Sequence, residues 1–188
     1  MARSAAIFDL DRTLLVGASG PLLSEAMRAA GVMSRSVPGE KFLYEIFNRI
    51  GETLPSMALA RQGATLAKGR SRTMVQNAAA TVAPRLAELV PSYARREIAE
   101  HRASGRLLVM ATTTPDDLIR PLAELLGFDD VVATRYGVDA SGNYDGRIDG
   151  EFVWNTGKLA AVSAWASAND VDLASSYAYS ESFLLIPL

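Results

Sequence analysis

The sequence contains no cysteine and only one histidine, His101. The absence of cysteine excludes disulfide bonds, thiolate zinc sites and cysteine nucleophiles, and it favours an intracellular protein. A single histidine is too few for a multi-histidine metal site, and it makes a Ser-His-Asp triad hard to build. His101 lies in a polar helical stretch, residues 95–102, and is therefore predicted to be a surface residue.

Neither sign of charge is in excess, since 19 Lys and Arg face 21 Asp and Glu, for a formal net charge of -2. This balance lacks the electrostatic footprint of a protein that binds nucleic acid or an anionic membrane, so neither partner is expected. No apolar stretch approaches the roughly 20 residues needed to cross a bilayer. Asp9 interrupts the apolar N-terminal run too early for a signal peptide. We therefore expect a cytoplasmic protein.

The chain of 188 residues, 49% of them hydrophobic, suits one compact core with a modest insertion. Short apolar runs alternate with helical patterns, which implies right-handed crossovers and a parallel sheet. The turn pairs Ser141-Gly142 and Asp145-Gly146 indicate a hairpin-like excursion before the last helix. The predicted strands cover residues 5–10, 106–114, 130–136 and 176–180, and the predicted helices between them cover 92–104, 115–127 and 157–169.

Residues 17–90 show helical patterns and no convincing strand. Gly31 is placed to end the first of these helices, and Pro84 is expected to kink or break the last one. The predicted helices cover residues 22–30, 42–50, 54–68 and 71–89. The sequence therefore predicts an α/β fold with a Rossmann-like three-layer parallel sheet core, residues 1–16 and 91–188, and an inserted helical segment, residues 17–90.

Polar residues follow several predicted strands, at the carboxyl ends where open parallel sheets bind ligands. Asp9, Asp11 and Thr13 follow the first strand, Thr112 to Thr114 the second, and Ser180 to Ser182 the last. Lys158 opens the helix that precedes the last strand. Because these segments are independent, their convergence at one edge of the sheet would form a plausible site.

Asp9 and Asp11 stand two positions apart, so in an extended strand end their carboxylates point the same way. Two carboxylates at such a short distance repel each other unless a cation or a shared proton lies between them. A carboxylate can attack phosphorus to form an acyl phosphate while its neighbour protonates the leaving group. Lys158, the Thr112 hydroxyl and loop amides would bind the phosphate oxygens, and Mg²⁺ would screen their charge.

The stretches "FDLDRT", "VMATTTP", "NTGK" and "YAYSES" resemble the ordered motifs of haloacid dehalogenase-like (HAD-like) phosphatases. The resemblance covers nearly the whole chain and is strongest to subclass IB, which contains phosphoserine phosphatase-like enzymes. It implies a Mg²⁺-dependent phosphomonoesterase that uses an aspartyl-phosphate on Asp9, with Asp11 as general acid and base. It also implies that residues 17–90 form a mobile cap that selects a small phosphorylated metabolite.

The resemblance also implies a set of site residues. The catalytic group would be Asp9, Asp11, Thr112 and Lys158, the phosphate-binding group Leu10, Asp11, Thr13, Thr112, Thr113 and Lys158, and the metal ligands Asp9, Asp11 and Glu181. The substrate itself does not carry over, because the insertion shows no convincing Glu and Arg pair placed as in the phosphoserine enzymes. The oligomeric state is not predicted.

The closing stretch departs from the family pattern, which usually has aspartate at the positions of Glu181 and Leu185. Mg²⁺ prefers near-ideal octahedral oxygen geometry, and leucine cannot ligate it, so weakened magnesium affinity and reduced turnover are expected. Relatives also continue beyond Leu188 with at least one further strand and helix. A catalytically silent phosphate-binding module, or a fragment, is therefore the alternative hypothesis.

Simpler interpretations accompany each residue. The Asp-x-Asp pattern also forms manganese sites in nucleotide-sugar transferases, which remain a third and minor hypothesis. Thr114, just before Pro115, suits the cap of the following helix better than a phosphate contact. Lys158 as a solvated helix residue and Glu181 as a surface acid are the corresponding alternatives.

Overall fold

The computed structural model describes residues 3–33 and 54–180. Its five-stranded sheet has the order β4-β3-β2-β1-β5. β1 pairs in parallel with both β2 and β5, β2 pairs in parallel with β3, and β4 runs antiparallel to β3. The predicted α/β fold with a parallel sheet is confirmed. The strands are β1 (Ala5–Phe8), β2 (Leu107–Pro115), β3 (Asp130–Val138), β4 (Tyr144–Asp149) and β5 (Tyr177–Tyr179).

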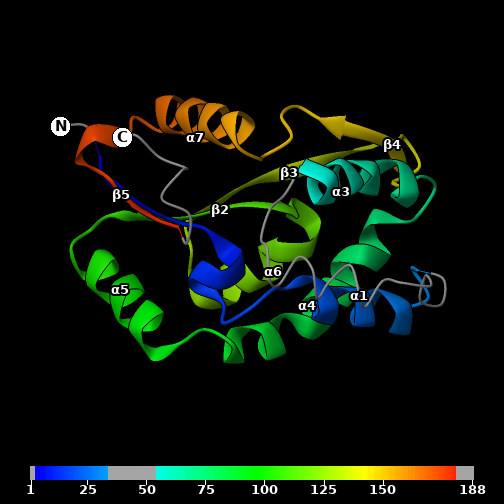
Figure 1. Ribbon diagram of the computed structural model, residues 1–188, viewed down its shortest axis with the longest axis horizontal. Helices are drawn as coiled ribbons and strands as arrows, with labels where there is room; N and C mark the ends of the chain where they lie inside the picture. The colour runs from blue at the N-terminus through cyan, green and yellow to red at the C-terminus, as the bar shows by residue number, and fades with distance from the viewer. Residues whose placement is uncertain (1–2, 34–53, 181–188) are drawn as a thin grey trace.

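Helices cover both faces of this sheet, which gives three layers (Figure 1). β1 is buried along its whole length because both of its faces are covered. Ile7 packs toward α7 in a cluster with Val162, whereas Phe8 packs on the other face with Ile98 and Ile119. The described helices are α1 (Gly20–Ala29), α3 (Leu54–Ala67), α4 (Arg72–Glu88), α5 (Ser92–Ala103), α6 (Asp116–Leu126) and α7 (Thr156–Ala168).

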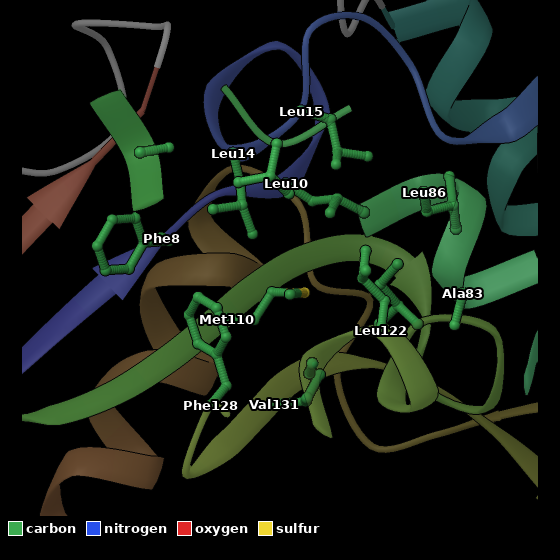
Figure 2. Close-up of a cluster of buried hydrophobic side chains, with 14 of the residues drawn as sticks. Phe8, Leu10, Leu14, Leu15, Ala83, Leu86, Met110, Leu122, Phe128 and Val131 are labelled. Carbon is green, nitrogen blue, oxygen red and sulfur yellow. The ribbon is translucent and has the colours of Figure 1, made fainter. Parts of the chain in front are cut away.

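The larger core cluster joins the sheet to helices on both sides of the predicted insertion boundary. Figure 2 shows Phe8 and Met110 of the sheet facing the same cluster as Leu122 of α6 and Leu86 of α4. Leu23 of α1 belongs to this cluster too. The first and last described helices of residues 17–90 are thus anchored in the core of the sheet.

The described part of the insertion is helical, as predicted, and α4 runs through Pro84 without a break. Pro84 removes the amide that would bond the carbonyl of Ala80. Ala80 is exposed, so its carbonyl can be hydrated and the helix can continue. The helix predicted over 42–50 lies outside the described residues. None of the helices in 3–33 and 54–180 has both the length and the apolar character of a membrane span.

The predicted hairpin forms where β3 extends past the end of β2 and turns into β4. Ser141-Gly142 lies in its turn, but Asp145-Gly146 lies within β4, so the second predicted turn is wrong. Gly146 has φ +91°, and an added Cβ there would lie only 3.1 Å from Cδ of Lys68, the residue that follows α3. The connection from α3 to α4 pairs with the start of β4, because Tyr144 N–H donates to Arg70 O at 3.0 Å and Gly69 N–H donates to Tyr144 O at 2.8 Å.

Candidate active site

Asp9, which is partly buried, and Lys158, which is buried, form an ion pair at the carboxyl end of the sheet. Asp9 directly follows β1, and its N–H donates to Tyr179 O of β5 at 2.9 Å. Lys158 Nζ lies 2.8 Å from Asp9 Oδ1, with the two side chains 8% and 16% exposed. A charge withdrawn from water is tolerated when an opposite charge lies beside it, and this contact supplies each residue with that partner. The other oxygen, Asp9 Oδ2, accepts no hydrogen bond from the described residues.

A wide turn carries the chain away from Asp9. Leu14 N–H donates to Asp9 O at 3.2 Å and Leu15 N–H to Leu10 O at 2.9 Å, so each hydrogen bond spans five residues. Arg12 adopts φ +60°, which lets its N–H reach Gly17 O at 2.9 Å. The Asp11 carboxylate accepts the N–H of the residue that precedes α1, Ser19. The turn therefore fixes Asp11 relative to the start of the insertion.

Thr112 lies near the end of β2 and is 2% exposed. Its hydroxyl accepts Thr114 N–H at 3.2 Å, which tightens the strand end. Thr114 makes no capping bond to α6, whose first residue is Asp116 after Pro115, so the predicted capping role is wrong. The register of β2 and β3 shifts between Thr112 and Pro115, which places two extra β2 residues at this point.

The loop that leads into α7 is hydrogen-bonded at Val153 to two threonine hydroxyls. Thr113 Oγ1 donates to Val153 O at 2.8 Å, and Val153 N–H donates to Thr134 Oγ1 at 3.1 Å. Val153 and Thr134 are 2% and 1% exposed. These bonds locate the loop five residues before Lys158. Thr134 was not predicted, because a threonine within an apolar strand carries no signal in the sequence.

The carboxylates are the candidate metal ligands. Oxygen ligands of this kind suit Mg²⁺. Asp9 and Asp11 are both described, but Glu181 and the leucine at 185 lie outside the described residues. Within 3–33 and 54–180, no three His, Asp or Glu side chains converge as a metal site. The donor chemistry of Asp9 and Asp11 fits magnesium.

His101 is buried, at 5% exposure, so its predicted surface position is wrong. Its Nε2 lies 2.7 Å from the hydroxyl of Tyr179, which itself donates to Glu97 Oε2 at 2.7 Å. Nδ1 lies 3.4 Å from Arg106 Nη1. This network requires a proton on Nε2 and none on Nδ1. Burial, followed by the charge of Arg106, lowers the pKa of His101 below 6.5.

A cavity of about 550 Å³ lies between the start of α4, the start of α6 and the β3–β4 hairpin. Arg72, Asp116, Asp117, Tyr136 and Asp145 are among its lining residues, whereas Asp9, Thr112 and Lys158 are not. Burial raises the pKa of the Tyr136 hydroxyl to about 12. Some of its charged residues are paired within the protein, since Asp116 binds Arg120 and Asp117 binds Arg72.

Comparisons with known proteins agree with this geometry. The model of the haloacid dehalogenase-like hydrolases matches residues 6–183. The chain is 30% identical over 194 residues to an "Inhibition of morphological differentiation protein" of Streptomyces azureus, covering 100% of this chain and 69% of that protein. It is 29% identical over 193 residues to a probable phosphatase of Mycobacterium tuberculosis, covering 100% and 66%. The chain therefore spans about two thirds of the length of these relatives.

Solved structures share the fold. A protein with unknown function from Bordetella pertussis Tohama I superposes with a TM-score of 0.78 at 26% identity, over 100% of this chain and 86% of that one. A phosphoserine phosphatase, solved as a phospho-aspartyl intermediate analogue, superposes with a TM-score of 0.60 at 21% identity, over 95% and 78%. At 21% identity, the similarity to the phosphoserine phosphatase shows a shared fold and nothing more.

Proposed function

Because the chain belongs to the haloacid dehalogenase-like hydrolase family, we propose that it is a phosphatase that hydrolyses small phosphate monoesters through a covalent phosphoryl group on Asp9. The observation that carries this proposal is the buried contact of 2.8 Å between Lys158 Nζ and Asp9 Oδ1 at the carboxyl end of β1. A carboxylate that must attack an anionic phosphate needs a cation beside it, and Lys158 supplies one within the chain.

The first step is attack of an Asp9 carboxylate oxygen on phosphorus. A new P–O bond forms to Asp9, the P–O bond to the ester oxygen breaks, and Asp11 gives its proton to the departing alkoxide. In the second step Asp11 takes a proton from water, whose oxygen attacks phosphorus and releases the carboxylate of Asp9. The products are an alcohol and inorganic phosphate, so protons and electrons balance over the cycle.

The phosphate oxygens would be held by groups at the ends of β1 and β2. Lys158 and the Thr112 hydroxyl supply charge and a hydrogen bond, and Leu10, Asp11, Thr13 and Thr113 complete the proposed set. The Thr113 hydroxyl already donates to Val153 O, so its contribution to phosphate would come from its backbone amide. Donors that are fixed in place before the reaction stabilise developing charge without reorganisation.

Magnesium would be held by Asp9, Asp11 and Glu181, and when bound it would neutralise charge on the transferring phosphoryl group. We assign the enzyme to subclass IB, and we propose that residues 17–90 cap the site and select the substrate. Support for the cap comes from the helical character of α1, α3 and α4, the first of which begins shortly after the turn that bears Asp11.

Turnover of a generic aryl phosphate at millimolar magnesium tests the proposal. The Asp9→Asn variant is expected to lose turnover, and Asp11→Asn is expected to slow it by about 10² to 10⁴-fold, as for loss of a general acid. Glu88→Gln, at an exposed position of α4, is a control for the same change of charge. Circular dichroism of each variant checks that the fold persists.

Retained turnover in Asp9→Asn would remove the assignment of the nucleophile. Absence of turnover in the wild type over a panel of phosphate esters would favour the alternative, a silent phosphate-binding module. The leucine at position 185, where the family usually has aspartate, is the observation that keeps this alternative open. Measurable Asp9-dependent release of phosphate would exclude it.

A further inference from the structure

The carboxylate of Asp117 receives hydrogen bonds from three side chains although it is nearly buried, at 8% exposure. Arg72 Nε lies 2.9 and 3.0 Å from its two oxygens, Gln76 Nε2 lies 2.7 Å from Oδ1, and the hydroxyl of Tyr144 lies 2.9 Å from Oδ2. A carboxylate offers about four acceptor sites, so these contacts nearly saturate it.

The donors come from segments that are far apart in the sequence. Arg72 and Gln76 are one turn apart on α4, within the insertion, and Tyr144 begins β4. Asp117 itself is in the first turn of α6, which starts directly after the Thr112 to Pro115 end of β2. The carboxylate of Asp117 therefore joins α4 and β4 to α6, the helix that follows the proposed phosphate-binding end of β2.

This junction is costly to disturb. The ion pair with Asp117 raises the pKa of the Arg72 guanidinium. Tyr144 is 2% exposed, so its hydroxyl would find no water if Asp117 stopped accepting its proton. A buried donor without a partner carries the full cost of its desolvation. The three elements are therefore held in one relative arrangement as long as the Asp117 carboxylate is in place.

We propose that Asp117 is a positioning residue of the phosphatase, which fixes the inserted helices relative to the phosphate-binding end of β2 and so sets the affinity for the organic part of the substrate. This inference rests on the proposed function. Asp117 touches neither Asp9 nor Lys158 in any described contact, so it acts on the reaction through the placement of α4 and α6.

Asp116 provides a matched control. It is also 8% exposed, and its carboxylate also binds an arginine through both oxygens, with Arg120 Nε at 2.9 Å and Nη2 at 2.6 Å. Arg120 belongs to the same helix and also approaches Asp130 of β3 at 3.6 Å. Loss of Asp116 thus breaks a similar ion pair without releasing α4 or β4.

The experiment compares Asp117→Asn and Asp116→Asn with the wild type in the full chain. The two measured quantities are KM for an aryl phosphate and the inhibition constant for inorganic phosphate, which has no organic part and would be held by the proposed phosphate-binding residues alone. Asp117→Asn is expected to raise KM about tenfold, a loss of roughly 1.4 kcal/mol of binding, and to leave the inhibition constant and kcat within about threefold. Asp116→Asn is expected to leave the ratio of the two constants unchanged.

An unchanged ratio in Asp117→Asn, or an equal change in Asp116→Asn, would overturn the inference. Hydrogen exchange of residues 72–88 provides a second readout that does not need turnover. Faster exchange of α4 in Asp117→Asn than in Asp116→Asn is expected, and equal exchange would refute the junction. An inactive wild type would instead refute the proposed function, with the exchange comparison still decisive for Asp117. If Asp117→Asn does not fold, Tyr144→Phe removes a single donor and should change both readouts in the same direction.

Discussion

The ion pair between Asp9 and Lys158 makes a prediction about stability that does not depend on any activity. We consider the single variants Asp9→Asn and Lys158→Met and the double variant. Each single change leaves one buried charge without its partner, because the two side chains are only 16% and 8% exposed. The double variant leaves no charge at all.

The expected magnitude follows from the distance. At 2.8 Å and an effective dielectric constant of about 20, two unit charges attract by about 6 kcal/mol. Desolvation of the two ions, several kcal/mol each, offsets most of this attraction, so the intact pair contributes little net stability. Removal of one partner costs about 3 to 5 kcal/mol, since the remaining charge keeps its desolvation penalty and loses the attraction. The double variant is therefore expected to be more stable than either single variant.

Urea denaturation of the four proteins measures these differences. With a slope of about 2 kcal/mol per molar urea, a loss of 3 to 5 kcal/mol lowers the midpoint by roughly 2 M. The midpoint of the double variant should lie between those of the single variants and that of the wild type. Glu88→Gln, at an exposed position, should leave the midpoint nearly unchanged.

The reasoning would be refuted if the two losses simply added, so that the double variant were the least stable of the four. Additive losses indicate side chains that do not interact. The buried contact at the end of β1 would then be absent in solution, and the proposed catalytic role of Lys158 would lose its basis.

Three further predictions concern other parts of the chain. The double variant Glu181→Asp, Leu185→Asp should reach half-maximal turnover at a lower magnesium concentration than the wild type. Equal magnesium midpoints in the two proteins would discard the idea that these positions weaken the metal site. Because the pKa of His101 is lowered in the folded state, the unfolded state binds the extra proton first as the pH falls. Stability should therefore decrease as the pH drops below 6.5. The urea midpoint of a His101→Gln variant should depend less on pH between about 7.5 and 5.5 than that of the wild type, and equal slopes would contradict this. Gly63→Ala should lose about 1 to 3 kcal/mol despite the better helix propensity of alanine, because the added Cβ would overlap the hydroxyl of Tyr136; a higher urea midpoint than that of the wild type would contradict it.

The sequence predicts the fold where the signal is local. The run AAIF is apolar on both faces and ends at Asp9, which is sufficient to predict a buried strand with a polar end. Parallel strands that alternate with helices then bring their carboxyl ends to one edge, and Lys158 does lie against Asp9 there, 149 positions away in the sequence. That contact follows from topology.

What the sequence does not reveal depends on partners from distant segments. His101 has polar neighbours along its helix, yet β5 covers it, so its burial is a property of the sheet edge and not of the helix pattern. From the sequence, Asp117 is an ordinary acidic residue in the first turn of a helix, where a carboxylate interacts favourably with the helix dipole. Its role as a junction appears only when Arg72 and Tyr144 are seen on either side of it.

The hydrogen bonds that hold the loop at Val153 limit the insertions and deletions that this chain can tolerate. Both backbone polar groups of that residue are satisfied by hydroxyls from two neighbouring strands, so an insertion or deletion of one residue in β2 or β3 would pull one hydroxyl out of reach. The proposed catalytic lysine follows five residues later. Its placement is thus tied to the alignment of β2 with β3. Length changes should therefore be tolerated in the turn between β3 and β4 but not within the paired parts of β2 and β3.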